Sequence, residues 1–316
     1  MGRYLIKRLA FAVLLVFVVS SAAFLLTRLA GDPCDPFKPD DCPRIRRELG
    51  LDRPFLEQYL AWLTRAARLD FGRSVLYSRP VSTLLGERAG NTAMLAITAL
   101  IMATLIGIPL GIYSGTTSAG GRSVVRFVST LGISIPPLIG SLALVFLAVR
   151  TGWLPVGGMT SGSGVEATWS AWLIDLAKHI PLPALALAIP IAASLERLQS
   201  EAIASAVHEP FVAASRARGV DRARSILIHA WPASLRPVLG LYGVMIGSLF
   251  SGSFIVEVVT SWPGLGRLMF EALRARDLFL VVGCAATGAF FLAAGTLLAD
   301  ILLAWTDPRV TAGERS

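Results

Sequence analysis

Long runs of apolar residues, separated by short polar segments, dominate the pattern along the chain. Each run approaches the roughly 20 residues that an α-helix needs to cross a bilayer. The runs are continuous, whereas the strands of a membrane β-barrel alternate in polarity over about 10 residues. The pattern therefore predicts an all-α, polytopic membrane protein with six transmembrane helices, at 9–29, 92–113, 127–149, 172–195, 238–259 and 279–305.

Two of these runs have features of their own. The first follows Arg3, Lys7 and Arg8, is longer than the apolar part of an ordinary signal peptide, and has no small-residue cleavage site after it. We expect it to be retained as the first span. The fourth contains Pro181, Pro183 and Pro190, which predict a broken helix.

Composition agrees with this class and charge suggests an orientation. Apolar residues make up 54% of the chain and charged residues 16%, and the net charge is +8. No Lys/Arg block is dense enough to indicate nucleic-acid binding, so the excess is attributed to topology and anionic lipid. The segments 1–8 and 114–126 carry Arg or Lys without any acid, and 196–236 also has an excess of Arg. These segments and the tail 307–316 are predicted to be cytoplasmic, which places both termini inside.

The chain is then predicted to have three main parts. Residues 1–29 form the N-terminal tail and first span, residues 30–91 form an extracytoplasmic cap, and residues 92–306 form the core. In the cap, the apolar residues after Pro54 recur at helical spacing and predict an amphipathic helix on the membrane or against the spans. These residues are Phe55, Leu56, Tyr59, Leu60, Leu63 and Ala67. Cys34 and Cys42 lie in the cap, where a disulfide and two unpaired thiols remain alternatives. Cys284, in the sixth run, is expected to be a packing residue.

No catalytic motif is present in the sequence. There is no Gly-x-x-x-x-Gly-Lys-Ser/Thr loop and no His-Glu-x-x-His pair, so neither a nucleotide, a metal nor another cofactor is expected in this chain. Two acids lie near membrane depth, where a transport role is one alternative. Glu257 would otherwise be hydrated at the outer interface or paired with Arg267, and Asp300 would pair with an Arg on the inner side.

The segment 196–236 contains the most informative local pattern. Pro210 suits the first position of a helix that extends to Arg218, and Gly219 suits a left-handed C-terminal residue. Asp221 can cap a following helix, which carries Ile226, Leu227 and Trp231 toward the fifth span. Such a basic elbow fits a cleft on another protein or rests on the inner leaflet, and the residues alone leave both alternatives open.

The same segment resembles the cytoplasmic coupling motif of ABC-importer permeases, Glu-Ala-Ala-x-x-x-Gly-x9-Ile-x-Leu-Pro. On this chain the motif positions are Ala213, Ala214, Ser215, Gly219, His229, Trp231 and Pro232. Ala213 and His229 depart from the general pattern. They are similar to the peptide-permease branch, whose core is found here as Phe211 followed by Ser215-Arg216-Ala217-Arg218-Gly219, and then His229-Ala230.

An ordered series of further segments resembles the same branch, in particular its B-type subunit. The segments are Arg3-Tyr4-Leu5-Ile6-Lys7-Arg8-Leu9, Gly31-Asp32-Pro33, Leu49-Gly50-Leu51-Asp52-Arg53-Pro54, Gln58-Tyr59, Asp70-Phe71-Gly72-Arg73-Ser74, Arg79-Pro80-Val81, Gly107-Ile108-Pro109-Leu110-Gly111, Ser261-Trp262-Pro263-Gly264-Leu265-Gly266-Arg267 and Asp307-Pro308-Arg309. The series spans nearly the whole chain, and its order makes it more specific than any one motif.

The resemblance implies the type I ABC importer fold and a permease subunit in a bacterial inner membrane. It implies a homologous C-type permease partner, two ATPase subunits that bind ATP and Mg, and an extracytoplasmic solute-binding protein. Di- and oligopeptides are the expected solutes, with nickel chelates, glutathione and sugars as alternatives. A secondary transporter and a receptor or structural membrane protein are the rival classes.

The resemblance also implies roles for individual residues. Phe211 would be the anchor that the ATPase buries, Gly219 the elbow, and Arg216 and Arg218 the charged contacts. The turn-rich run 261–267, between the fifth and sixth predicted spans, would gate the outer mouth or contact the binding protein. The alternative is a re-entrant structural loop. The candidate residues of this run are Trp262, Pro263, Gly264, Gly266 and Arg267.

Overall fold

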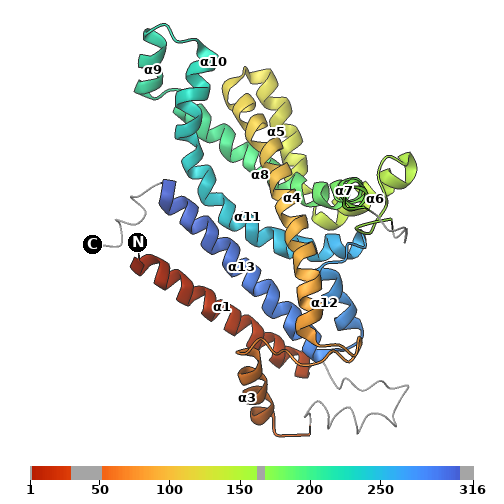
Figure 1. Ribbon diagram of the computed structural model, residues 1–316. Coiled ribbons are helices and arrows are strands. Elements are labelled where there is room, and N and C mark those ends of the chain that lie inside the picture. Colours follow the sequence, from red (N-terminus) through yellow and green to blue (C-terminus); the bar gives the residue numbers. More distant parts are fainter. Residues whose placement is uncertain (1, 30–51, 162–167, 307–316) are drawn as a thin grey trace. The chain divides into compact units, whose positions relative to one another are not determined.

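The computed structural model describes residues 2–29, 52–161 and 168–306, and within these ranges the regular elements are helices (Figure 1). Arg73 and Pro80 form an isolated β-bridge. The helices are α1 (Gly2–Leu29), α3 (Phe55–Ala66), α4 (Val81–Thr116), α5 (Ala119–Ser134), α6 (Pro137–Thr151), α7 (Trp169–His179), α8 (Pro181–Ala206), α9 (Pro210–Ala217), α10 (Arg222–Ser225), α11 (Trp231–Val259), α12 (Leu265–Arg274) and α13 (Leu278–Thr306). A π-helical turn, Ile226–Ala230, joins α10 to α11.

Five helical stretches among the described residues are long and apolar enough to cross a membrane, which confirms the all-α polytopic prediction. They lie in α1, α4, α8, the α10–α11 stretch and α13. A sixth span results if α5 and α6 are counted as one broken span, because the two helices meet at an angle of 103°.

The third predicted span, at 127–149, therefore needs correction, since it is two helices and not one. Ile135 leaves the helical region, with φ −88° and ψ 110°, directly before Pro136. A residue before proline disfavours the α conformation, and neither Pro136 nor Pro137 has an N–H group to continue the helix. The two consecutive prolines explain the bend.

The fourth predicted span, at 172–195, is broken as expected, although its bounds differ. α7 ends at His179 and α8 begins at Pro181, where proline occupies the first helical turn. Pro190 lies inside α8, which continues to Ala206. The break thus occurs at the first proline, and the later ones are accommodated within α8.

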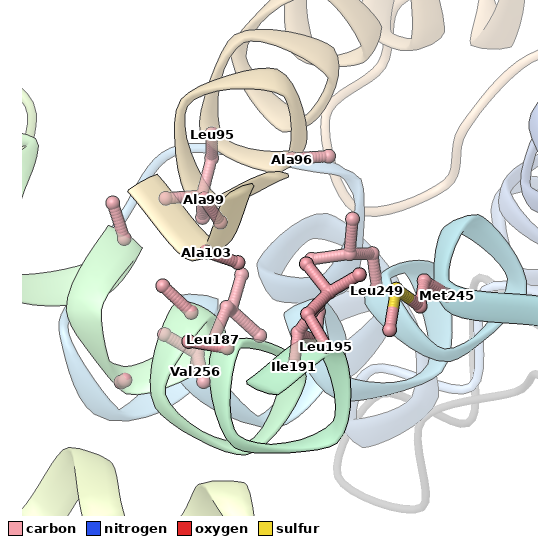
Figure 2. Packing of buried hydrophobic residues seen from close by; sticks show 14 of the residues in the cluster. Leu95, Ala96, Ala99, Ala103, Leu187, Ile191, Leu195, Met245, Leu249 and Val256 are labelled. Carbon is pink, nitrogen blue, oxygen red and sulfur yellow. The ribbon is translucent and has the colours of Figure 1, made fainter. Parts of the chain in front are cut away.

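The chain divides into two compact units, and each is described by itself. One unit comprises residues 1–9, 93–262 and 294–316, and the other comprises residues 10–92 and 263–293. In the first unit, buried apolar residues of α4, α8 and α11 form the core, among them Leu95, Ala99, Leu187, Ile191 and Leu249 (Figure 2). This core joins three segments that are far apart in the sequence.

Small residues let α4 approach α8 closely within the first unit. A Cβ atom added at Gly107 would lie 2.6 Å from the carbonyl oxygen of Ala192, and one at Gly111 would lie 2.6 Å from the Cβ of Gln199. A Cβ atom added at Gly115 would likewise collide with the side chain of Ile203. Glycine at every fourth position is a common way for membrane helices to bring their backbones together.

In the second unit, α3 packs against α1. This agrees with one of the two alternatives for the predicted amphipathic helix, namely that it lies against the spans. Trp62 is buried and stacks on Phe24 with ring centroids 5.0 Å apart, and the hydroxyl groups of Tyr59 and Ser21 are 2.8 Å apart. The prediction missed Trp62. Phe55, Leu56 and Leu60 of the predicted apolar face are exposed in the chain itself.

Candidate coupling site

The segment 210–225 folds into two short helices joined by a tight turn, at the end of α8 and before α11 (Figure 1). Pro210 is the first residue of α9, and Gly219 follows the helix with φ +85°. The Gly219 N–H donates to the carbonyl oxygen of Arg216 over 2.9 Å. The Asp221 carboxylate accepts a hydrogen bond from the Ala223 N–H over 2.9 Å and so caps α10. These three local predictions are confirmed, and the helix lies within one residue of its predicted bounds.

One face of α9 is packed onto its own chain. Val212 and Ser215 are buried, and Val212 belongs to a small apolar cluster with Ile203 and Ala206 of α8 and Ile226 and Ala230 of the π-helical turn. The cluster attaches α9 to the ends of the two long helices that flank it. A displacement of α9 is therefore a displacement of these helix ends as well.

The opposite face of α9 is open. The exposed members of the predicted coupling set are Phe211, Ala213, Ala214, Arg216, Arg218, Gly219 and Pro232, whereas Ser215 is buried. Phe211 is 46% exposed. At the turn that follows α9, an open depression of about 530 Å³ is lined by Ala213, Arg216, Gly219, Val220 and Arg222. A slim, basic and partly apolar surface of this kind suits a protein partner with an acidic cleft.

Two arginines cap the C-terminal end of α4, a relationship that sequence reasoning missed. Arg222 of α10 donates from Nη2 to the carbonyl oxygen of Thr116 over 3.0 Å. Arg122 of α5 donates from Nε to the carbonyl oxygen of Ser114 over 3.1 Å. The last carbonyls of a helix lack partners within the helix, and cations at this end also complement its dipole. The turn at Gly219 is thereby tied to α4 as well as to α8 and α11.

Beneath this surface, buried polar side chains join the same three helices. The Ser114 hydroxyl of α4 donates to Glu196 Oε1 of α8. Gln199 of α8 donates from Nε2 to the Ser234 hydroxyl of α11 over 2.7 Å. All four side chains are buried. No local sequence pattern distinguishes Glu196 from the other charged residues of the segment 196–236.

The predicted outer-gate run is largely packed into the chain. Trp262 is buried in the apolar core of the first unit. In the second unit the carbonyl oxygen of Pro263 accepts from Asn91 Nδ2 over 2.8 Å, and the Leu265 N–H donates to Thr92 Oγ1 over 2.8 Å. Gly264 and Gly266 are buried. Arg267 is partly exposed and contacts Glu271 over 3.0 Å. The role of this run stays a prediction.

The two acids near membrane depth have different surroundings. Asp300 of α13 lies 3.1 Å from Arg8 Nε of α1, which confirms the predicted pairing with an arginine. Glu257 is fully buried, with 0% of its surface exposed. The alternative of a hydrated Glu257 at the interface is therefore wrong.

In the second unit, Asp277 organises the segment that carries the Asp70–Ser74 signature. Its carboxylate accepts from the Ser74 hydroxyl over 2.6 Å, from the Leu76 N–H over 3.0 Å, and from the Leu280 N–H over 3.2 Å. Nearby, the Tyr77 hydroxyl donates to Glu271 Oε2. Burial, together with this hydrogen bond, raises the pKa of Tyr77 to about 12. The signature is thus part of the packing that holds the start of α13.

The structure describes one of the three cysteines. Cys34 and Cys42 lie outside the described residues, so the disulfide stays a prediction. Cys284 is buried in the apolar cluster of the second unit, as expected for a packing residue. Among the residues that the structure describes, no group of three or more His, Cys, Asp or Glu side chains is arranged to hold a metal ion.

Comparison with known families matches most of the chain. Residues 107–312 match the binding-protein-dependent transport system inner membrane component family, and residues 1–83 match the N-terminal family of such membrane components. The chain is 30% identical over 319 residues to the oligopeptide transport system permease protein AppB of Bacillus subtilis, covering 98% of this chain and 99% of that protein. It is 34% identical over 322 residues to a putative peptide transport system permease protein of Brucella abortus, and the match covers 98% of this chain and 99% of that protein.

One solved structure supports the fold. A chain of the MetNI methionine ABC transporter, in an inward-facing conformation, matches with a TM-score of 0.53 and 16% identity. The match covers 71% of this chain and 96% of that chain. At this identity the likeness concerns the fold alone, and it agrees with the expected type I importer architecture.

Proposed function

The chain belongs to the family of binding-protein-dependent transport system inner membrane components, and on that premise we propose that it is a transmembrane permease subunit of an ATP-driven peptide importer. The peptide substrate is supported by relatives whose names describe peptide or oligopeptide permeases and which match nearly end to end. The binding protein that the family description mentions would deliver the solute. The chain itself is a multi-pass membrane protein.

The complete transporter would contain a homologous second permease and two ATPases, which bind ATP and Mg and carry out hydrolysis. We place α9, α10 and both termini in the cytoplasm and the 30–91 cap outside. The run 261–267 would then lie at the outer mouth, where it gates the passage or contacts the binding protein.

The observation that carries the proposal is the two-sided packing of α9. Its open face presents Phe211, Arg216 and Arg218 to a partner, while its closed face is fixed to α8 and the π-helical turn. Arg222 adds a direct connection to α4. A push from an ATPase on the open face would therefore move the inner ends of α4, α8 and α11 together. Such a displacement changes the equilibrium between outward and inward states only when the partner contacts the two states differently.

Cysteine cross-linking of the assembled complex tests this docking. Ala213→Cys and Ala214→Cys place thiols on the open face of α9, and we expect both to cross-link to a cysteine in the ATPase cleft, with a yield that depends on ATP. The matched control is Thr151→Cys, which is exposed at the end of α6 on the proposed outer side. Equal yields for α9 and for residue 151 would contradict the docking.

A further inference from the structure

A small basic cavity lies between α5 and α8, apart from the coupling site. It has a volume of about 110 Å³ and is lined by Arg126, Thr130, Arg197 and Glu201. Arg126 and Thr130 are one turn apart on α5, and Arg197 and Glu201 are one turn apart on α8. The two helices pack directly, since a Cβ atom added at Gly132 of α5 would lie 3.1 Å from the Cβ of Ala193. The cavity is therefore held between two fixed walls.

Both arginines of this cavity have guanidinium groups available for binding. Within the described part of the chain, neither Arg126 nor Arg197 has a side-chain hydrogen bond or ion pair, in contrast to Arg122 and Arg222. Each guanidinium carries five N–H donors in a geometry that matches phosphate oxygens. Two such groups from neighbouring helices form a clamp for one anion.

The exposed surface of α5 also carries an apolar stripe. Val124, Phe127, Val128 and Leu131 follow the spacing i, i+3, i+4 and i+7, and each is at least 49% exposed. In a membrane protein, an exposed stripe of this kind is a surface for acyl chains. The basic cavity is thus on the same helix as a surface on which a lipid tail can lie.

We propose that the cavity of Arg126 and Arg197 binds the phosphate of an anionic phospholipid, whose acyl chains follow the apolar stripe of α5. Basic pockets between transmembrane helices are suited to such headgroups. Glu201 reduces the formal charge of the lining from +2 for the two arginines to +1. That charge favours a headgroup with a single phosphodiester, such as phosphatidylglycerol, over one with several negative charges. The site is independent of the transported solute.

Native mass spectrometry of the complete transporter complex tests the site by titration with dioleoyl phosphatidylglycerol and dioleoyl phosphatidylcholine. The Arg126→Ala/Arg197→Ala double variant should bind phosphatidylglycerol about tenfold more weakly, with phosphatidylcholine unchanged. Glu201→Gln should strengthen phosphatidylglycerol binding, because it removes the one negative charge of the lining. Arg150→Ala is the matched control, since Arg150 is an exposed arginine of α6 that lies over the Phe146 ring.

Three results would overturn the proposal. One is phosphatidylglycerol binding by the double variant within about twofold of the parent complex. A second is full competition by millimolar inorganic phosphate, which would assign the cavity to a soluble anion. The third is unchanged lipid binding together with loss of a subunit, which would assign the arginines to an acidic side chain of a partner protein. Because Glu201→Gln is expected to strengthen binding, a general loss of folding cannot imitate the predicted pattern.

Discussion

Arg222 Nη2 donates a hydrogen bond to the carbonyl oxygen of Thr116 over 3.0 Å, across a separation of 106 residues. The bond joins the turn that presents α9 to the last residue of α4. α9 is also packed on α8 and on the start of the α11 stretch. The exposed surface of α9 is therefore continuous with one end of each of the three helices that form the core of the first unit.

Arg222→Ala should reduce the amount of peptide taken up per ATP hydrolysed, because it removes one of these connections and leaves the open face of α9 in place. A cation at a helix C-terminus contributes about 1 kcal/mol at most when exposed, so we expect about a fivefold decrease in the ratio. Uptake and ATP hydrolysis are measured on the same proteoliposomes. Arg224→Ala, an exposed change on the same short helix, should leave the ratio as it is. A proportional loss of both activities would point to assembly and not to transmission.

Gly219→Val should abolish ATP-driven uptake while the complex still assembles. Gly219 has φ +85°, and a Cβ atom there would meet nothing within 4 Å, so the defect would come from the backbone. Residues other than glycine are disfavoured in the left-handed region by about 1–2 kcal/mol, and β-branched residues most of all. Gly219→Asn should retain partial uptake, since asparagine tolerates this conformation.

A control for this prediction is available at another helix end. Gly152 follows α6 with φ +67° and also has nothing within 4 Å of a Cβ atom. Gly152→Val imposes similar strain away from the coupling site, and it should preserve most of the uptake. Equal losses in the two valine variants would show that strain alone, and not the position of the elbow, accounts for the effect.

Gly111→Ala should destabilise the first unit, because the new Cβ atom would lie 2.6 Å from the Cβ of Gln199 and 2.8 Å from the carbonyl oxygen of Glu196. Overpacking of this kind typically lowers the free energy of unfolding by about 1–3 kcal/mol. Thermal unfolding in detergent measures the effect. Gly90→Ala on the same helix meets nothing within 4 Å and should be neutral or slightly stabilising. A thermal midpoint that is the same for both variants would argue against the close approach of α4 and α8.

Tyr77 should titrate near pH 12, above the ordinary value of 10.0 for tyrosine. The folded state binds the phenol proton more tightly than the unfolded state. The stabilisation from Tyr77 is therefore complete below pH 10 and is lost as the pH rises from about 10 to about 12. The difference in phenolate absorbance between the parent and Tyr77→Phe gives the midpoint directly. A midpoint close to 10 would contradict the hydrogen bond to Glu271.

Features that depend on near neighbours in the sequence were predictable. Pro210, Gly219 and Asp221 each act through backbone groups within a few residues, so residue type alone indicated the helix start, the left-handed turn and the cap. Pro181 likewise marked the break before α8. The bend at Ile135 was missed because the hydropathy of 127–149 is continuous, although Pro136 and Pro137 indicate it.

Features that depend on distant residues could not be derived from one sequence. Ser74 and Asp277 are 203 residues apart, and nothing local shows that the serine of the Asp70–Ser74 signature donates to that carboxylate. The same limit applies to Arg222 and Thr116. Trp262 illustrates the reverse case: a turn-rich run suggested an accessible loop, but tertiary packing buries its largest side chain.

The source of energy for uptake tests the central claim most directly. The permease pair, the ATPases and the binding protein are reconstituted in proteoliposomes, and uptake of a labelled oligopeptide is measured with ATP, without ATP, and with ATP plus an ionophore. We predict uptake that requires both ATP and the binding protein and that persists when the ionophore removes the ion gradients. Uptake that persists without ATP and stops with the ionophore would contradict the account and assign the chain to a secondary transporter.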